Sequence, residues 1–143
     1  GGHGCLEAYA SRSAIESRIL GAIKKGRASI ITDFADSSSI SSKHIKKSLD
    51  ARDEIVTQYV NEAIEYLSGG IASVINFYNP ELVILGGGLI QSIDDFYLGT
   101  IKKARVKALP VPAGTVKFKK AELDDYSGVI GASMLSEWRQ QTN

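Results

Sequence analysis

The sequence predicts an α/β protein. Two short stretches have the pattern of strands, the apolar run "LVIL" at residues 82–85 and the alternating "TVKFKKAEL" at residues 115–123. In several other stretches apolar residues recur every three or four positions, as on the buried face of a helix. Helices that alternate with at least two strands define this class.

Length and composition favour one domain over residues 1–143. The chain is 43% hydrophobic and 23% charged, which is ordinary for a globular domain. A net charge of +1 excludes a strong electrostatic attraction to nucleic acid or to an anionic membrane. No apolar run approaches the ~18–20 residues that span a bilayer, so we expect no membrane partner. A single cysteine fits a reducing cytoplasm, the location that we expect. Because no initiator methionine is present, we expect the chain to be a fragment.

Three segments in the first half are predicted in order. Ser13 and Glu16 match the S-x-x-E capping box, so a helix is expected to start at Ser13 and to end in the basic turn before Gly26. The stretch "ASIITDFADSSSISS" is interpreted as a connector with at most a brief strand. A short helix follows, capped by Ser41 or Ser42.

The strongest helical pattern runs from about Ala51 to Tyr78, and Pro80 ends it. Gly69 and Gly70 lie inside this helix. Glycine costs about 0.5–1 kcal/mol in a helix relative to alanine, so close packing against another backbone is the expected compensation.

The second half is predicted to run strand, turn, helix, break, strand, helix. The apolar run at 82–85 indicates a strand buried on both faces. "SIDDFYLGTIKKARVKAL" indicates a helix, and "PVPAG" a turn-rich break. Val116 and Phe118 alternate with lysines, as in a half-exposed strand. "DYSGVIGASMLSEW" indicates a final helix that carries Gly128 and Gly131.

The glycine triplet Gly86, Gly87 and Gly88 directly follows the first predicted strand. In α/β proteins ligands gather at the carboxyl ends of strands, and bare backbone lets a nucleotide approach closely. The triplet matches neither G-x-G-x-x-G nor the P-loop pattern. A tight turn that needs positive φ explains it equally well from local sequence.

The opening stretch "GGHGCLEAYAS" gathers Cys5 and Glu7 among glycines. Taken alone, Cys5 is explained as a small buried residue and Glu7 as a helix cap. The full pattern is more specific, since it closely resembles the end of the C-x-C-G-x-x-G-C-x-E signature of the ROK family (repressors, open reading frames and sugar kinases). "NPELVILGGGLI" resembles the later glycine motif of the family, and "DYSGVIGASML" its closing helix. The three matches follow the family order and cover essentially the whole chain.

The resemblance implies the C-terminal lobe of the actin-like ATPase (ribonuclease H-like) fold, with several helices around a small mixed sheet and the N-terminal lobe absent. It implies that Glu7 accepts hydrogen bonds from sugar hydroxyls. It implies that the triplet 86–88 passes near the adenosine part of ATP, and that Gly128 and Gly131 aid helix packing near that site. Cys5 matches the last cysteine ligand of a structural Zn²⁺. The other three ligands are absent from the sequence, so the zinc site is incomplete in this fragment.

The function implied is an ATP-dependent hexose kinase, glucokinase-like, with Mg²⁺ on the phosphates. The catalytic aspartate and both phosphate loops of the family lie upstream, so no catalytic residue is assigned here and the fragment alone is expected to be inactive. The partners implied are a hexose, ATP and a second copy of the protein in a dimer.

Two alternatives remain open. One is the sugar-binding effector domain of a ROK transcriptional repressor, for which nucleic acid is a partner through an upstream helix-turn-helix. The other is a lobe used only for assembly, in which the long helix near Gly69 and Gly70 forms a subunit contact. The same helix packed within its own lobe is the simpler explanation.

Overall fold

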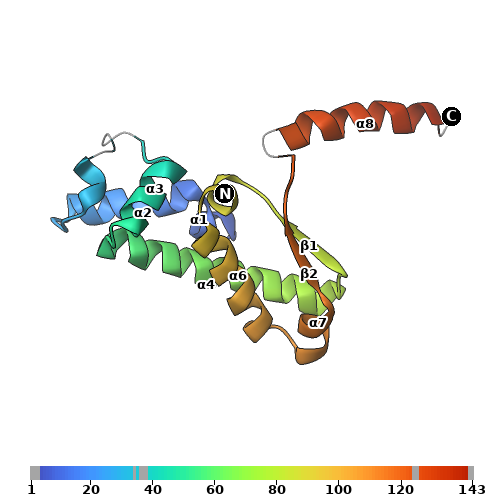
Figure 1. Cartoon of the computed structure of the whole chain (residues 1–143), viewed down its shortest axis with the longest axis horizontal. Coiled ribbons are helices and arrows are strands. Elements are labelled where there is room, and N and C mark those ends of the chain that lie inside the picture. The colour runs from blue at the N-terminus through green and yellow to red at the C-terminus, as the bar shows by residue number, and fades with distance from the viewer. Residues whose placement is uncertain (1–3, 34, 36–38, 124–125, 142–143) are drawn as a thin grey trace.

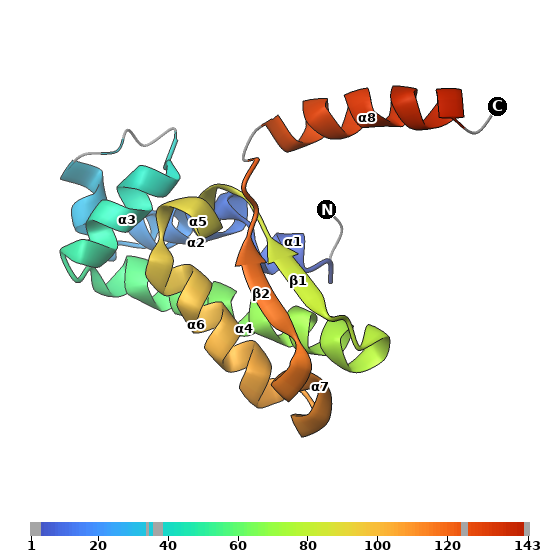
Figure 2. The ribbon, with the colours of Figure 1, turned by 45° about the vertical axis from the view of Figure 1, so that its right-hand side comes forward.

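The computed structural model describes residues 4–33, 35, 39–123 and 126–141 (Figure 1). Among the described residues, helices pack on one face of a small sheet, and one long helix runs along most of the other elements (Figures 1 and 2). In chain order the elements are α1 Glu7–Ala10, α2 Arg12–Lys24, the 3₁₀ helix η1 Ile30–Asp33, α3 Ser42–Asp50, α4 Glu54–Tyr78, β1 Leu82–Leu85, α5 Gly88–Ser92, α6 Asp94–Lys107, α7 Pro110–Thr115, β2 Lys117–Lys120 and α8 Ser127–Gln141.

Helix α4 is the long helix that the sequence predicts, and Asp53 fixes its start. The Asp53 carboxylate accepts hydrogen bonds from the Val56 amide at 3.0 Å, the Ile30 amide at 2.8 Å and the Ser29 hydroxyl at 2.6 Å. The helix ends at Tyr78, as predicted, and its C-cap Asn79 has a left-handed φ of 44° just before Pro80. The predicted start at Ala51 was therefore three residues early.

None of the helices within the described ranges is long and apolar enough to cross a membrane.

The cap of α2 differs from the prediction. Ser11, not Ser13, is the N-cap, and its hydroxyl accepts from the Ala14 amide at 3.1 Å. Glu16 completes no capping box, because the third residue after Ser11 is Ala14; the Glu16 carboxylate instead accepts from the distant Ile40 amide at 2.7 Å. At the other end Gly26 has the positive φ, 87°, typical of a residue that follows a helix.

Three other local predictions can be compared with the structure. The Ser41 hydroxyl accepts from the His44 amide, which confirms one of the two caps expected for α3. The segment "PVPAG" was predicted as a break but forms α7, because Pro110 stands in the first turn, where its missing N–H costs nothing. The connector has no strand among its described residues, in keeping with the expectation of at most a brief one, and Ile30 and Ile31 begin η1.

Strands β1 and β2 form a two-stranded parallel sheet in which Leu82 pairs with Lys117 and Leu85 with Lys120. The prediction of a mixed sheet is wrong for the described residues, since α5, α6 and α7 lie between the two strands and return the chain to run parallel. The expectation that β1 is buried on both faces is also wrong. Leu82 is 42% exposed and Ile84 60% exposed, while Val83 and Leu85 face the core.

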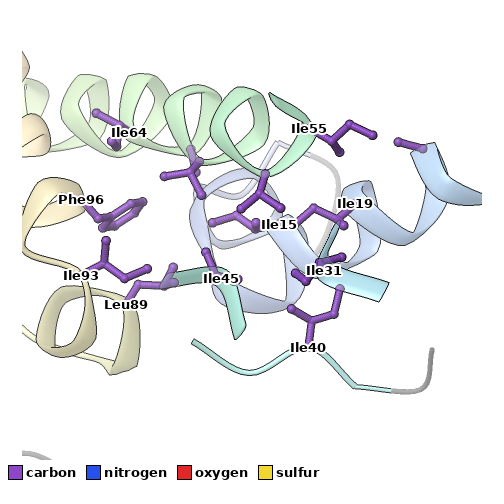
Figure 3. Close-up of a cluster of buried hydrophobic side chains, with 14 of the residues drawn as sticks. Ile15, Ile19, Ile31, Ile40, Ile45, Ile55, Ile64, Leu89, Ile93 and Phe96 are labelled. Carbon is purple, nitrogen blue, oxygen red and sulfur yellow. The ribbon is translucent and has the colours of Figure 1, made fainter. Parts of the chain in front are cut away.

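The core has two clusters, and both include residues of α4. The larger one joins α2, α3, α4, α5 and α6 through fully buried side chains such as Ile15, Ile19, Ile45 and Phe96 (Figure 3). The smaller one lies under the sheet and joins α4 to α6, α7 and β2. Each buried isoleucine contributes roughly 1.5–3 kcal/mol of transfer free energy, so these clusters hold the helices in place.

Charges reinforce the contact of α6 with α4. The Glu65 carboxylate forms ion pairs with Lys103 and, at 2.6 Å, with Lys107. Hydrogen bonds from these two ammonium groups lower the pKa of Glu65 to about 2. The pairs are exposed, so they orient α6 more than they stabilise it.

Helix α8 lies apart from the rest of the ribbon (Figures 1 and 2). Val129, Met134 and Leu135 are more than half exposed on it. A Cβ atom added at Gly128 or Gly131 would meet nothing within 4 Å. The expected helix packing at these two glycines is therefore wrong for the described residues.

The Asp53 cap yields a stability prediction. Burial raises the pKa of Asp53, but hydrogen bonds from Ser29, Val56 and Ile30 outweigh it and hold the pKa below its ordinary value. The pKa of the folded state is thus below that of the unfolded state, and the cap stabilises the fold fully above about pH 4 and less as the pH falls through the folded pKa. Asp53→Ala should cost about 2 kcal/mol in urea unfolding near neutral pH.

The same substitution should flatten the acid dependence of stability, since the titrating group is gone. Asp50→Ala is the matched control, because the interaction of Asp50 within the described part of the chain is an exposed ion pair with Lys46. If Asp53→Ala and Asp50→Ala lowered the free energy of unfolding by the same amount, the stabilising role of the Asp53 cap would be contradicted.

Candidate functional site

A cavity of about 380 Å³ lies where α1 and the start of α2 face the turn between β1 and α5. Its lining unites the two stretches singled out in the sequence, since Glu7 forms one side and Gly86, Gly87 and Gly88 the other. Leu67 of α4 and Phe96 of α6 line it as well. Residues almost eighty positions apart in the chain thus share one cavity.

Glu7 stands in the first turn of the short helix α1. The helix stops at Ala10 because Ser11 turns into extended backbone and caps α2, while the Ser11 amide donates to the Glu7 carbonyl at 3.1 Å. The Glu7 side chain is exposed and makes no hydrogen bond or ion pair within the described part of the chain. Its two oxygens are free to accept hydrogen bonds from hydroxyl groups of a ligand.

The glycine turn follows the carboxyl end of β1. Gly87 has φ of 104°, which L side chains rarely adopt, so the turn itself requires glycine there. Space is short at its neighbours: a Cβ at Gly86 would lie 3.1 Å from the Ala121 side chain, and one at Gly88 3.2 Å from the Ser42 hydroxyl. The turn-based explanation of the triplet is correct for Gly87, and the same bare backbone lines the cavity.

The sequence interpretation missed Arg12, which also lines the cavity. Its guanidinium donates to the Ile40 carbonyl at 2.7 Å and to the Glu16 carboxylate at 3.1 Å. These bonds fasten the segment before α3 to α2. Arg12 is five residues past Glu7, so the two side chains would not lie on the same face of one continuous helix. The chain breaks at Ser11 between α1 and α2, and this break brings both residues to the cavity. Helical periodicity in the sequence therefore could not predict that they lie together.

Cys5 precedes α1 and is an exposed free thiol. Across the described residues, no three His, Cys, Asp or Glu side chains gather in a way that could hold a metal ion. The first motif positions, Gly1 to His3, lie outside the described residues. A structural zinc needs about four ligands, so the described residues by themselves do not fit one.

Comparison with known proteins agrees with the motifs. The model of the ROK family matches residues 1–139. A glucokinase of Halalkalibacterium halodurans is 30% identical over 142 residues, 98% of this chain and 42% of that protein. The DNA-binding transcriptional dual regulator NagC of Escherichia coli K12 is 30% identical over 136 residues, 94% of this chain and 32% of that protein. The chain therefore spans less than half the length of either relative.

The fold agrees as well. A ROK family glucokinase from Streptomyces griseus, solved in complex with glucose and AMPPNP, superposes with a TM-score of 0.72. It is 23% identical, and the match covers 94% of this chain and 45% of that one. With the family model matching nearly the whole sequence, the chain belongs to the ROK family.

Proposed function

We propose that residues 1–143 form the C-terminal lobe of an ATP-dependent hexose kinase, glucokinase-like, which phosphorylates glucose or a related hexose. The cavity that joins Glu7 to the glycine turn carries the proposal. Transfer of the γ-phosphate to a sugar hydroxyl requires donor and acceptor side by side, and most of its acceleration comes from that positioning. A carboxylate for the sugar and a bare turn for the nucleotide on one cavity meet this requirement.

Each residue has a proposed role. Glu7 accepts hydrogen bonds from two neighbouring sugar hydroxyls, since a carboxylate offers two oxygens and makes charge-assisted bonds. Gly86, Gly87 and Gly88 let the adenosine part of ATP approach the backbone. The glucose and AMPPNP in the Streptomyces griseus glucokinase support sugar and nucleotide as the ligand classes.

The remaining parts belong to the complete protein. The catalytic base, the two phosphate loops and the Mg²⁺ that balances the phosphate charge are proposed to come with the upstream lobe. Cys5 is proposed as one ligand of a structural Zn²⁺ completed by upstream residues. The complete protein is proposed to be a cytoplasmic dimer.

The sugar-binding effector domain of a repressor is the second candidate, because NagC is as similar to this chain as the Halalkalibacterium glucokinase is. The intact glycine turn favours the kinase, since a repressor has no need to bind ATP. Full-length protein separates the two: ADP release with Mg-ATP and glucose, N-acetylglucosamine or N-acetylmannosamine supports a kinase. Sugar-dependent release from DNA without turnover supports a repressor.

Glu7→Gln in the full-length protein should lower kcat/KM for the sugar by about 100-fold, because charge-assisted bonds to two hydroxyls are lost. The KM for ATP should stay within about twofold. Glu81→Gln is the control, since Glu81 is a surface glutamate outside the lining of the cavity. Unchanged sugar kinetics in Glu7→Gln would remove Glu7 from the site.

Gly87→Ala should raise the KM for ATP by about 10-fold or more while affecting the KM for the sugar less, because the positive φ cannot be kept without strain. Gly114→Ala is the control: a Cβ there meets nothing within 4 Å and φ is not in the positive region. Steady-state kinetics with each substrate varied in turn gives both constants. If the KM for ATP were the same in Gly87→Ala and Gly114→Ala, the glycine turn would be excluded from nucleotide binding.

The 143-residue chain alone should bind sugar weakly and release no ADP above background, because it lacks the proposed base and phosphate loops. A coupled assay of the purified chain with Mg-ATP and each hexose checks this. Sugar-dependent ADP production by the chain alone would overturn the proposal that the catalytic base and the phosphate loops lie in the upstream lobe.

A further inference from the structure

Helix α1 has only four residues, Glu7–Ala10, and its N-cap Leu6 makes no side-chain capping bond. A single turn of helix is not stable by itself. Something else must therefore hold the backbone that carries Glu7, and the contacts of α1 with α4 provide it.

Three residues of α4 at four-residue spacing, Glu62, Tyr66 and Gly70, contact residues of the segment 6–18, which includes α1. Residues spaced by four lie on one face of a helix. We call them the α4 stripe. Glu62 and Tyr66 both contact Arg18 of α2, Tyr66 also contacts Tyr9 of α1, and Gly70 faces Leu6, the N-cap of α1. The stripe therefore supports the segment around Glu7.

At the first two positions the contact is electrostatic and aromatic. The Arg18 guanidinium donates to the Glu62 carboxylate at 3.1 Å. It also lies over the rings of Tyr9 and Tyr66, at 5.6 and 5.7 Å from their centroids. The two rings pack with centroids 4.6 Å apart. Tyr9 of α1 is thereby joined to α4 on one side of Glu7.

At the third position the contact is steric. A Cβ atom built on Gly70 would lie 2.7 Å from Cδ2 of Leu6 and 3.5 Å from its Cδ1. Leu6 directly precedes Glu7 and lines the same cavity. A side chain at position 70 therefore has to displace the end of the Leu6 side chain from its present position beside α4, and Leu6 is joined directly to Glu7. Gly69, one position earlier, has nothing within 4 Å of its added Cβ.

We propose that Gly70 is a positioning residue for Glu7: by leaving room for Leu6 on the α4 stripe it sets where the sugar-binding carboxylate lies in the cavity. The inference rests on the proposed role of Glu7 in sugar binding. It also explains a glycine inside the longest helix, where the expected close approach to a backbone is replaced by an approach to a leucine side chain.

Gly70→Val and Gly69→Val in the full-length protein form a matched pair, because both place the same β-branched residue at neighbouring positions inside α4. The change in intrinsic helix propensity is therefore the same for both variants. Gly70→Val should raise the KM for the sugar by about 10-fold, with the KM for ATP within about twofold. Gly69→Val should leave both near the wild-type values. The double variant Leu6→Ala with Gly70→Val should return to within about threefold of Leu6→Ala alone, because the clash is gone.

Sugar affinity that is equal in the two valine variants would overturn the inference, and so would a Gly70→Val effect that is as large for ATP as for the sugar. If Gly70→Val does not fold in a thermal melt, the pair Gly70→Ala and Gly69→Ala is judged by the same criteria. Wild-type protein without turnover on any hexose would defeat the proposed kinase instead. Sugar affinity by calorimetry, with Glu7→Gln as reference, would then decide about Gly70.

Discussion

The structure depends on the burial of helix α4 along its length. Its apolar residues enter both core clusters, so α2, α3 and α6 pack on its first part and α7 and the sheet on its last part. A helix of 25 residues can serve this way only if its start is fixed, and the Asp53 carboxylate does so by joining the first turn of α4 to Ser29 and Ile30. The remaining short elements gain their stability from this one surface.

The candidate site follows from the same helix. On one face the α4 stripe seats α1, which carries Glu7. On another, Leu67 packs against both core clusters and reaches the cavity, while Leu85 of β1 leads into the glycine turn. The two sides of the cavity are therefore held by one rigid element. A packing change in α4 that spares the fold can still shift Glu7 relative to the glycine turn, which joins the stability of this chain to its chemistry.

Features of the fold that depend on neighbouring residues in the sequence could be predicted, whereas those that depend on contacts between distant residues could not. The helices with strong apolar periodicity and the second strand could be predicted, because their patterns are local. The α2 cap could not be, because Ser11 and Ser13 both suit the role, and the Glu16 that suggested Ser13 instead bonds the distant Ile40 amide. The exposure of Ile84 could not be either, since an apolar run does not say how many layers cover a sheet.

The chemical groups of the candidate site can be identified from the amino-acid order alone: a carboxylate in the "GCLE" motif, a glycine turn after a strand, and the family pattern that includes both. The three-dimensional fold was needed to see that these groups share a cavity, that Arg12 and Leu6 belong to its lining, and that Gly70 makes room for Leu6. The reason is physical. Motifs record local backbone needs and side-chain chemistry, whereas the meeting of residues 7, 70 and 87 depends on how helices pack, and packing is fixed by shape across the whole core.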